Sequence, residues 1–376
     1  MLQRDVQIIS VDDHVIEHPT VWQDRLPDKF KEAGPKIVRD DAGNDVWMFE
    51  GRPHYNIGLN AVAGKRREDY GVDPARYEDM RPGCYLMEDR LKDMDEDGIW
   101  AQLCFPTFPG FAGSTFWRAD DKELASACVR AYNDWMIDEW CASAPERMIP
   151  LVLMPYWDAE ECVREAERTA GKGAKAISFI EAPHSVGLPS FHTDHWDRFL
   201  SAVSNTGMPL CLHFGSGGPP PTAPNGPFTA AIALYGLNSL MTTVELVNSR
   251  IFEKAPDLKV ALSEGGIGWM PYILERADYT WDRHRFYTGM SDARRPSEIF
   301  RDHIFGCFIS DDAGLRNLDL IGVDNVIFEG DYPHSDSNWP HARKMLEESL
   351  AHVPDDVARK IAEDNARKLF HFPRRG

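Results

Sequence analysis

Residues 9–19 form the stretch ISVDDHVIEHP, an apolar run that ends in three carboxylates and two histidines. Charges so dense at the end of a buried strand are costly unless something neutralises them. The run 6–13 is the first of a series of short apolar runs, and the others span 101–107, 148–155, 174–181, 208–215, 259–266, 304–312 and 325–334. They do not alternate cleanly between apolar and polar residues, which is typical of parallel strands that are covered on both faces.

Helical patterns separate most of these runs, for example at 121–144, 158–170 and 195–206. Strands that alternate with helices in this way predict an α/β fold, a (β/α)8 TIM barrel formed by residues 1–376 as a single domain. A long insertion, residues 18–97, follows the first strand and contains a predicted hairpin around 41–44. Because such an insertion starts at the C-terminal face of the barrel, we expect it to cap the active site.

Composition restricts the classes of partner. The chain has 376 residues, 43% of them apolar, and a net charge of −19, which argues against non-specific binding to nucleic acid or to an anionic membrane. No signal-peptide core and no apolar run of membrane-spanning length is visible in the sequence. Seven dispersed cysteines favour reduced, buried thiols, so we expect a cytoplasmic protein.

Polar side chains fall where the predicted strands end, and this is the face on which barrel enzymes carry their chemistry. These residues are Asp12, His14, Glu17, Glu181, His213, Glu264, Asp331 and His334. A lone histidine or carboxylate at such a position is usually hydrogen-bonded or caps a helix, and Asp311 or Asp312 fits a capping role. Glu181 is equally compatible with a metal ligand and with a residue behind the ligands.

Five of these strand-end residues are harder to explain one at a time: Asp12, His14, His213, Glu264 and Asp331. Without a partner, the three carboxylates would repel one another and resist ionisation. A bound cation removes that repulsion. The pattern therefore predicts a metal site at the mouth of the barrel.

At these residues the sequence resembles the amidohydrolase superfamily, and within it the branch around aminocarboxymuconate semialdehyde decarboxylase and the resorcylate-type decarboxylases. The HxH or ExH pair of the first strand is matched by Asp12-x-His14, the histidine of the fifth strand by His213 in CLHFG, and the aspartate of the eighth by Asp331 in EGDYPH. Two residues depart from the pattern, since Asp12 stands for a histidine and Glu264, in SEGGIGW, replaces the catalytic histidine of the sixth strand.

The same motifs also resemble a smaller group of amidohydrolase-like barrels, which includes a nonheme di-iron monooxygenase of diterpenoid antibiotic biosynthesis. This resemblance implies an oxidoreductase that uses O2 and an external electron donor to hydroxylate an apolar, terpenoid-like substrate, with a coenzyme A-linked substrate as one option. Two iron ions would be held by Asp12, His14, Glu17, His213, Glu264 and Asp331, with Glu264 and Asp331 in catalysis. Four carboxylates and two imidazoles also equal the donor count of di-iron carboxylate proteins.

An alternative follows from the better-known relatives, namely a mononuclear hydrolase or nonoxidative decarboxylase with one Zn or Mn ion. Asp331 would then bind metal and move protons, and Glu264 would be an acid or base. A non-catalytic ligand-binding barrel leaves the strand-end carboxylates unexplained. In each enzymatic case we expect Glu181 and His334 behind the ligands, a homodimer as an option, and Phe105, Phe111 and Trp117 either against a small-molecule substrate or in the core of a lid.

Overall fold

The computed structural model describes residues 2–289 and 294–374, and parallel strands form its centre. One sheet has the order β1-β5-β6 and the other β12-β11-β10-β9-β8-β7. The strands are β1 (Ile9–Val15), β5 (Ala101–Pro106), β6 (Met148–Ile149), β7 (Leu151–Leu153), β8 (Ala176–Ser178), β9 (Leu210–His213), β10 (Val260–Ser263), β11 (Ile304–Phe308) and β12 (Val326–Phe328).

Two junctions join these sheets into a closed barrel. Pro150 separates β6 from β7, and its carbonyl accepts the amides of Lys175 (2.9 Å) and Ala176 (3.2 Å). On the other side, the amide of His14 donates to the carbonyl of Tyr332 (2.6 Å) and the amide of Asp331 donates to the carbonyl of Asp12 (2.8 Å). The predicted (β/α)8 barrel is therefore confirmed, and its last strand closes against its first.

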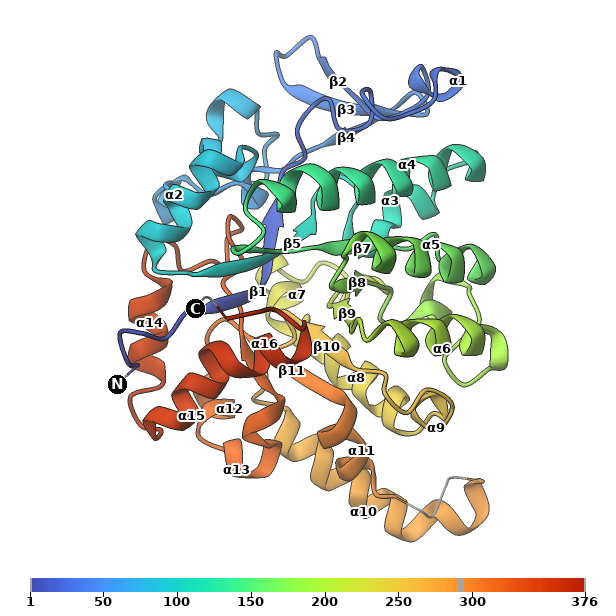
Figure 1. The fold of residues 1–376 in the computed structure, drawn as a ribbon, viewed down its shortest axis with the longest axis vertical. Helices are drawn as coiled ribbons and strands as arrows, with labels where there is room; N and C mark the ends of the chain where they lie inside the picture. Colours follow the sequence, from blue (N-terminus) through green and yellow to red (C-terminus); the bar gives the residue numbers. More distant parts are fainter. Residues whose placement is uncertain (1, 290–293, 375–376) are drawn as a thin grey trace.

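Helices surround the strands (Figure 1). They are α1 (Asp28–Lys31), α2 (Met87–Asp97), α3 (Ser114–Trp117), α4 (Lys122–Trp135), α5 (Ala159–Lys172), α6 (Asp197–Thr206), α7 (Phe228–Leu234), α8 (Gly236–Val247), α9 (Ile251–Lys254), α10 (Met270–Thr288), α11 (Pro296–His303), α12 (Asp312–Leu315), α13 (Leu318–Ile321), α14 (Ala342–Ser349), α15 (Asp355–Arg359) and α16 (Asn365–Leu369). Side-chain caps start several of them. Asp121 accepts the amides of Glu123 and Leu124 at α4, and Asp311 accepts that of Gly314 at α12, which confirms its expected capping role.

The core has two layers. Strand side chains that point inward, such as Ile9, Leu103, Cys211 and Ile327, fill the barrel, and a larger apolar cluster lies between the strands and the helices. All seven cysteines are buried and unpaired, as expected for reduced thiols. Because apolar side chains fill the barrel, the polar strand ends remain as the place for chemistry.

The insertion after β1 has three parts. An antiparallel sheet of β2 (Lys36–Arg39), β3 (Asp45–Phe49) and β4 (Arg52–Tyr55) lies beyond α4 at one end of the molecule, and it contains the predicted hairpin around 41–44 (Figure 1). Residues within 57–72 line the cavity at the barrel mouth. Helix α2 then leads into β5. Only the middle part borders that cavity, so a cap formed by all of 18–97 stays a prediction, as does the single-domain division.

Helices α7 and α8 contain an apolar stretch that the sequence prediction passed over. By length and composition alone, Phe228–Val247 could cross a membrane, with a mean hydropathy of 1.4. A core helix of a soluble protein can meet the same criteria, so this is weak evidence for a membrane span. The cytoplasmic location stays a prediction.

Candidate metal centre

Three side chains with metal-binding atoms converge at the end of β1. Asp12 and His14 lie two residues apart on that strand, His213 ends β9, and all three are fully buried. Nε2 of His14 lies 3.3 Å from Oδ1 of Asp12, and Nε2 of His213 lies 3.7 Å from Oδ2 of Asp12. None of these atoms has a hydrogen-bond partner among the described residues. Buried polar atoms without partners are rare, and these atoms have free positions that a bound ion would use.

A second group shares His14 with the first. Oδ1 of Asp331 lies 3.3 Å from Nε2 of His14 and 3.1 Å from Nδ1 of His334. The His334 ring stacks on the His14 ring, with centroids 3.6 Å apart. Both oxygens of Asp331 lack hydrogen bonds within the described parts of the chain. Asp331 thus extends the donor cluster from β1 and β9 to the end of β12.

The electrostatics of the cluster favour a bound cation. Burial, with Glu264 and other acidic neighbours, raises the pKa of the Asp12 and Asp331 carboxyls well above their usual range. Burial also lowers the pKa of His14 well below its usual value, so its ring is neutral and free to bind a metal. Two carboxylates and two imidazoles converge here, and this donor set fits one divalent cation.

His213 and Glu264 form an ion pair. Nδ1 of His213 donates to the carbonyl of Phe214 (2.7 Å), which directs Nε2 towards the cluster. Burial alone would lower the pKa of His213, but Asp12 and Glu264 raise it to about 9. Oε2 of Glu264 lies 3.0 Å from this Nε2. Glu264 follows β10 with φ +57°, a strained conformation of the kind that functional sites retain.

Glu17 occupies a different environment. Its Oε1 accepts the amide of Thr107 and its Oε2 accepts the amide of Phe108, each at 2.9 Å. The side chain is fully buried, and burial raises its pKa to about 7. Both oxygens therefore hold the loop after β5, and Glu17 lies outside both groups of converging donors.

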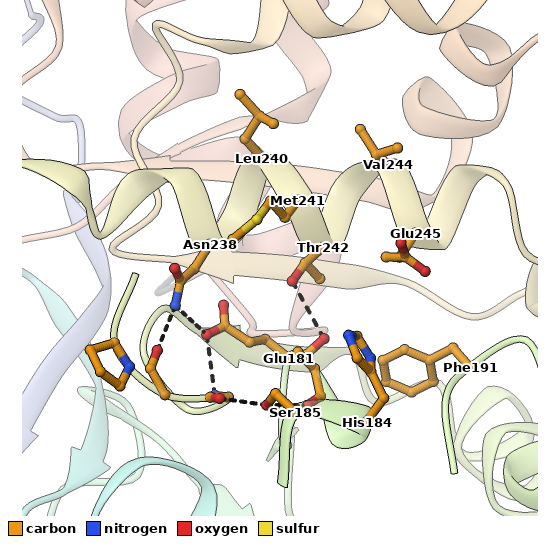
Figure 2. Close-up of a pocket in the computed structure, with 14 residues that line it drawn as sticks. Glu181, His184, Ser185, Phe191, Asn238, Leu240, Met241, Thr242, Val244 and Glu245 are labelled. Atoms are coloured by element: carbon orange, nitrogen blue, oxygen red, sulfur yellow. Dashed lines mark hydrogen bonds between the residues drawn. The ribbon is translucent and has the colours of Figure 1, made fainter. Parts of the chain in front are cut away.

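Glu181 lies in a separate pocket between the loop after β8 and α8 (Figure 2). Its Oε1 accepts the side-chain amide of Asn238 (3.1 Å) and the backbone amide of Gly217 (3.2 Å). Burial raises its pKa to about 7. The structure therefore places Glu181 apart from the donor cluster, with protein groups on one of its oxygens.

The three aromatic residues expected near a substrate fall in three environments. Phe111 stacks on the His213 ring, with centroids 4.1 Å apart, and lines the cavity at the barrel mouth. Phe105 is fully buried in β5 behind His213, at 5.2 Å between ring centroids. Trp117 packs on Tyr156 at 5.7 Å. Only Phe111 is in a position to touch a ligand.

Sequence analysis missed Glu329. This residue is fully buried directly after β12, and its Oε2 accepts the amide of Glu264 (3.0 Å). Its position two residues before Asp331 was a usable signal, because alternate residues of an extended chain point to the same side.

A cavity opens above the donor cluster. Its inner part, about 370 Å³, has a polar floor of His14, Glu264, Asp331 and His334. The walls are largely apolar and are formed by Ile57, Leu59, Phe111, Phe214, Ile232 and Tyr235, among others. An enclosed apolar cavity with convergent polar groups is the usual form of a small-molecule site.

A barrel with a cluster of metal-donor side chains near its strand ends is typical of metal-dependent barrel enzymes. The amidohydrolase family model matches residues 18–372. The chain therefore belongs to the amidohydrolase family.

The curated relatives of the chain are decarboxylases. Gamma-resorcylate decarboxylase of Rhizobium sp. (strain MTP-10005) is 24% identical over 305 residues, which cover 76% of this chain and 87% of the relative. The enzyme of the same name from Polaromonas sp. (strain JS666 / ATCC BAA-500) is 23% identical over 314 residues, covering 77% and 88%.

Solved structures share the fold. An amidohydrolase from Mycobacterium avium subsp. paratuberculosis K-10 superposes with a TM-score of 0.73 at 21% identity, covering 98% of this chain and 100% of the other. The 5-carboxyvanillate decarboxylase of Sphingomonas paucimobilis superposes with a TM-score of 0.68 at 22% identity, covering 98% of this chain and 99% of the other. A dihydroxybenzoic acid decarboxylase of Polaromonas sp. JS666 was solved with manganese and 2-nitroresorcinol. It superposes with a TM-score of 0.63 at 18% identity, covering 98% of each chain.

These comparisons correct the main functional prediction. The expectation of a dinuclear iron monooxygenase of antibiotic biosynthesis, with an external electron donor, is wrong, because the curated relatives are decarboxylases. The two iron ions are wrong as well, since the solved neighbours with a named metal hold manganese. The physical reason lies in the donor count, which included Glu17, whose two oxygens both accept backbone hydrogen bonds.

Proposed function

We propose that this chain is a nonoxidative decarboxylase that removes CO2 from an aromatic carboxylic acid with the help of one divalent ion, manganese or zinc. The observation that carries the proposal is the convergence of unpartnered atoms of Asp12, His14, His213 and Asp331, of which His14 and Asp331 line the floor of a largely apolar cavity. The names of the relatives supply the reaction and the class of substrate.

Asp12, His14, His213 and Asp331 would hold the ion. When bound, the ion would act as a Lewis acid that binds oxygens of the substrate. The protein contributes position. His213 is oriented by the carbonyl of Phe214, and Phe111 covers its ring. The apolar walls exclude water and hold the aromatic ring above the donors.

Asp331 is the proton carrier in this proposal. It lines the floor of the cavity beside His14 and His334, where its oxygens can reach a bound substrate. It delivers the proton to the ring carbon that bears the carboxylate. The bond to CO2 then breaks, and its electron pair restores the aromatic ring. Nδ1 of His334, 3.1 Å from Oδ1 of Asp331, lies where a replacement proton can be passed on.

Glu264 is the second acid–base group that we assign. It lines the cavity and takes the strand-six position at which the resembling branch has a histidine. From there it can accept a proton from a ring hydroxyl of the substrate. A homodimer stays part of the proposal, without a residue assigned to its interface.

The test is a reconstitution under argon. The purified chain is stripped of metal, reloaded with one equivalent of Mn²⁺ or Zn²⁺, and given 2,6-dihydroxybenzoate or 5-carboxyvanillate. We expect CO2 release without O2, bound metal near one ion per chain, and no turnover by the stripped protein. If neither acid nor its ring-substituted analogues lose CO2 with either metal, the proposal fails.

The proton-carrier role has its own test. Asp331→Asn keeps the shape of the side chain and removes its acidic proton, so kcat should fall by about 10²–10⁴-fold. Metal content and circular dichroism show whether the site and the fold survive. A kcat within about threefold of the parent, with metal bound, would assign the proton to another group.

A further inference from the structure

We infer that the substrate is an aromatic acid that carries an extended, neutral, apolar substituent, and that this substituent lies against α7 in the outer part of the cavity. The inference rests on the proposed decarboxylase function and specifies the class of acid on which it acts.

The cavity above the donor cluster continues outward into a larger hollow. Beyond the inner cavity of about 370 Å³ lies an outer hollow of about 910 Å³. The two share Leu59, Phe214, Phe228, Ile232, Glu264 and Asp336 in their walls, so they are parts of one channel. Cavities of about 300–1,000 Å³ enclose drug-sized ligands, which are larger than a single-ring acid. A single-ring acid bound at the donor cluster would leave the outer hollow unfilled.

The chemistry of the outer walls supports the same inference. Val72 and Phe228 are each 59% exposed and Ile232 is 37% exposed, and all three border the outer hollow. They come from the insertion after β1 and from α7, two segments distant in sequence that meet here. Exposed apolar side chains that gather around one concavity mark a ligand groove more often than a plain surface.

The charge of the outer walls favours a neutral substituent. The outer hollow is lined by Glu264, Glu329 and Asp336, and Arg67 is the one arginine or lysine among its described lining residues. A second anionic group on the substrate would meet three carboxyl groups and one cationic side chain there, so this wall offers it no net attraction. A neutral substituent, an alkyl chain or a second ring, needs no such attraction and gains from contact with the apolar side chains.

This assignment also accounts for the hydropathy of Phe228–Val247. At its start, Phe228 and Ile232 face the channel, and further on Leu246 and Val247 are buried in the core. One apolar segment thus serves the substrate at one end and the core at the other.

The experiment is a homologous series of substrates. The Mn²⁺-loaded enzyme is given 2,6-dihydroxybenzoates that carry hydrogen, methyl, propyl or pentyl at the ring carbon opposite the carboxylate. With the carboxylate at the donor cluster, that carbon is the ring position farthest from the cluster. We expect KM to fall about two- to fourfold for each added methylene, with kcat nearly unchanged, because the gain is uniform binding energy.

A matched pair of variants locates the effect. Ile232→Asn should abolish most of the gain for the pentyl compound, so that the ratio of the KM values of the unsubstituted and pentyl acids approaches one. Leu237→Asn is the control, since Leu237 is 40% exposed at the start of α8 but does not line the channel. If all members lose CO2 with the same KM, or if the two variants behave alike, the substituent does not lie along α7 although the decarboxylase stands. If no member loses CO2, the proposed function itself has failed.

Discussion

Buried carboxylates near the strand ends of this barrel form two groups that differ in what their oxygens meet. Both oxygens of Asp12 and of Asp331 lack hydrogen-bond donors in the described chain. Both oxygens of Glu17, and one oxygen of Glu181, instead accept amide hydrogens. Burial raises the pKa of all four. The difference therefore lies in the partners, and a carboxylate without protein donors is the one that requires an external cation.

The largest effect expected from this comparison is that of Asp12→Asn. Loss of a hydrogen-bonding partner behind a metal ligand already lowers metal affinity about 10–100-fold, and loss of a direct ligand should exceed that. We expect the purified variant to contain little metal by elemental analysis and to release no CO2 above background.

Asp13→Asn is the matched control for that variant. Oδ1 of Asp13 accepts the amide of Tyr332 (2.9 Å), and an asparagine oxygen can accept the same bond. The control should therefore keep its metal. Loss of metal from Asp13→Asn together with retention by Asp12→Asn would reverse the assignment of ligands on β1.

The barrel could be predicted from the sequence because its strands are continuous apolar runs, and continuous runs survive any detail of packing. The ends were less accurate. The last strand was expected over 325–334, whereas β12 ends at Phe328 and the chain then turns through Glu329 to Asp331, which has φ +53°. That turn brings Asp331 to His14, and no local sequence pattern predicts the turn.

Site residues divide in the same way. Asp12, His14, His213 and Asp331 were predicted together because each falls at the end of a predicted strand, and barrel topology alone brings the ends of strands together. Glu17 is also an acidic residue, and it follows Asp12 and His14 closely in the sequence. The direction of its side chain, however, depends on the loop at Thr107 and Phe108. Contacts between a strand and a distant loop cannot be predicted from the sequence of either segment alone.

A smaller effect is expected from Glu17→Gln, the isosteric change in the group held by amides. A glutamine oxygen can accept one of the two backbone amides, and its NH2 group opposes the other. One buried donor is then unpaired, at a cost of about 1–3 kcal/mol in the free energy of unfolding, measured by urea titration. Metal content should stay at the parental value and kcat within about tenfold, since Phe111 shifts but no ligand is lost. Loss of the metal would return Glu17 to the ligand set.

The smallest effect sharpens the comparison through pH. Burial raises the folded-state pKa of Glu181 to about 7 from the usual 4.5, so the folded protein holds this proton more tightly than the unfolded chain does. The stability that this provides is complete below about pH 4.5 and is lost as the pH rises through 7. Glu181→Gln keeps an oxygen for Gly217 and Asn238 but cannot ionise. The unfolding free energy of the variant, relative to the parent, should therefore rise between about pH 5 and pH 8, as measured by urea titration at several pH values. A constant difference across that range would mean that Glu181 is ionised throughout, and that its amide donors balance its burial as well as a cation would.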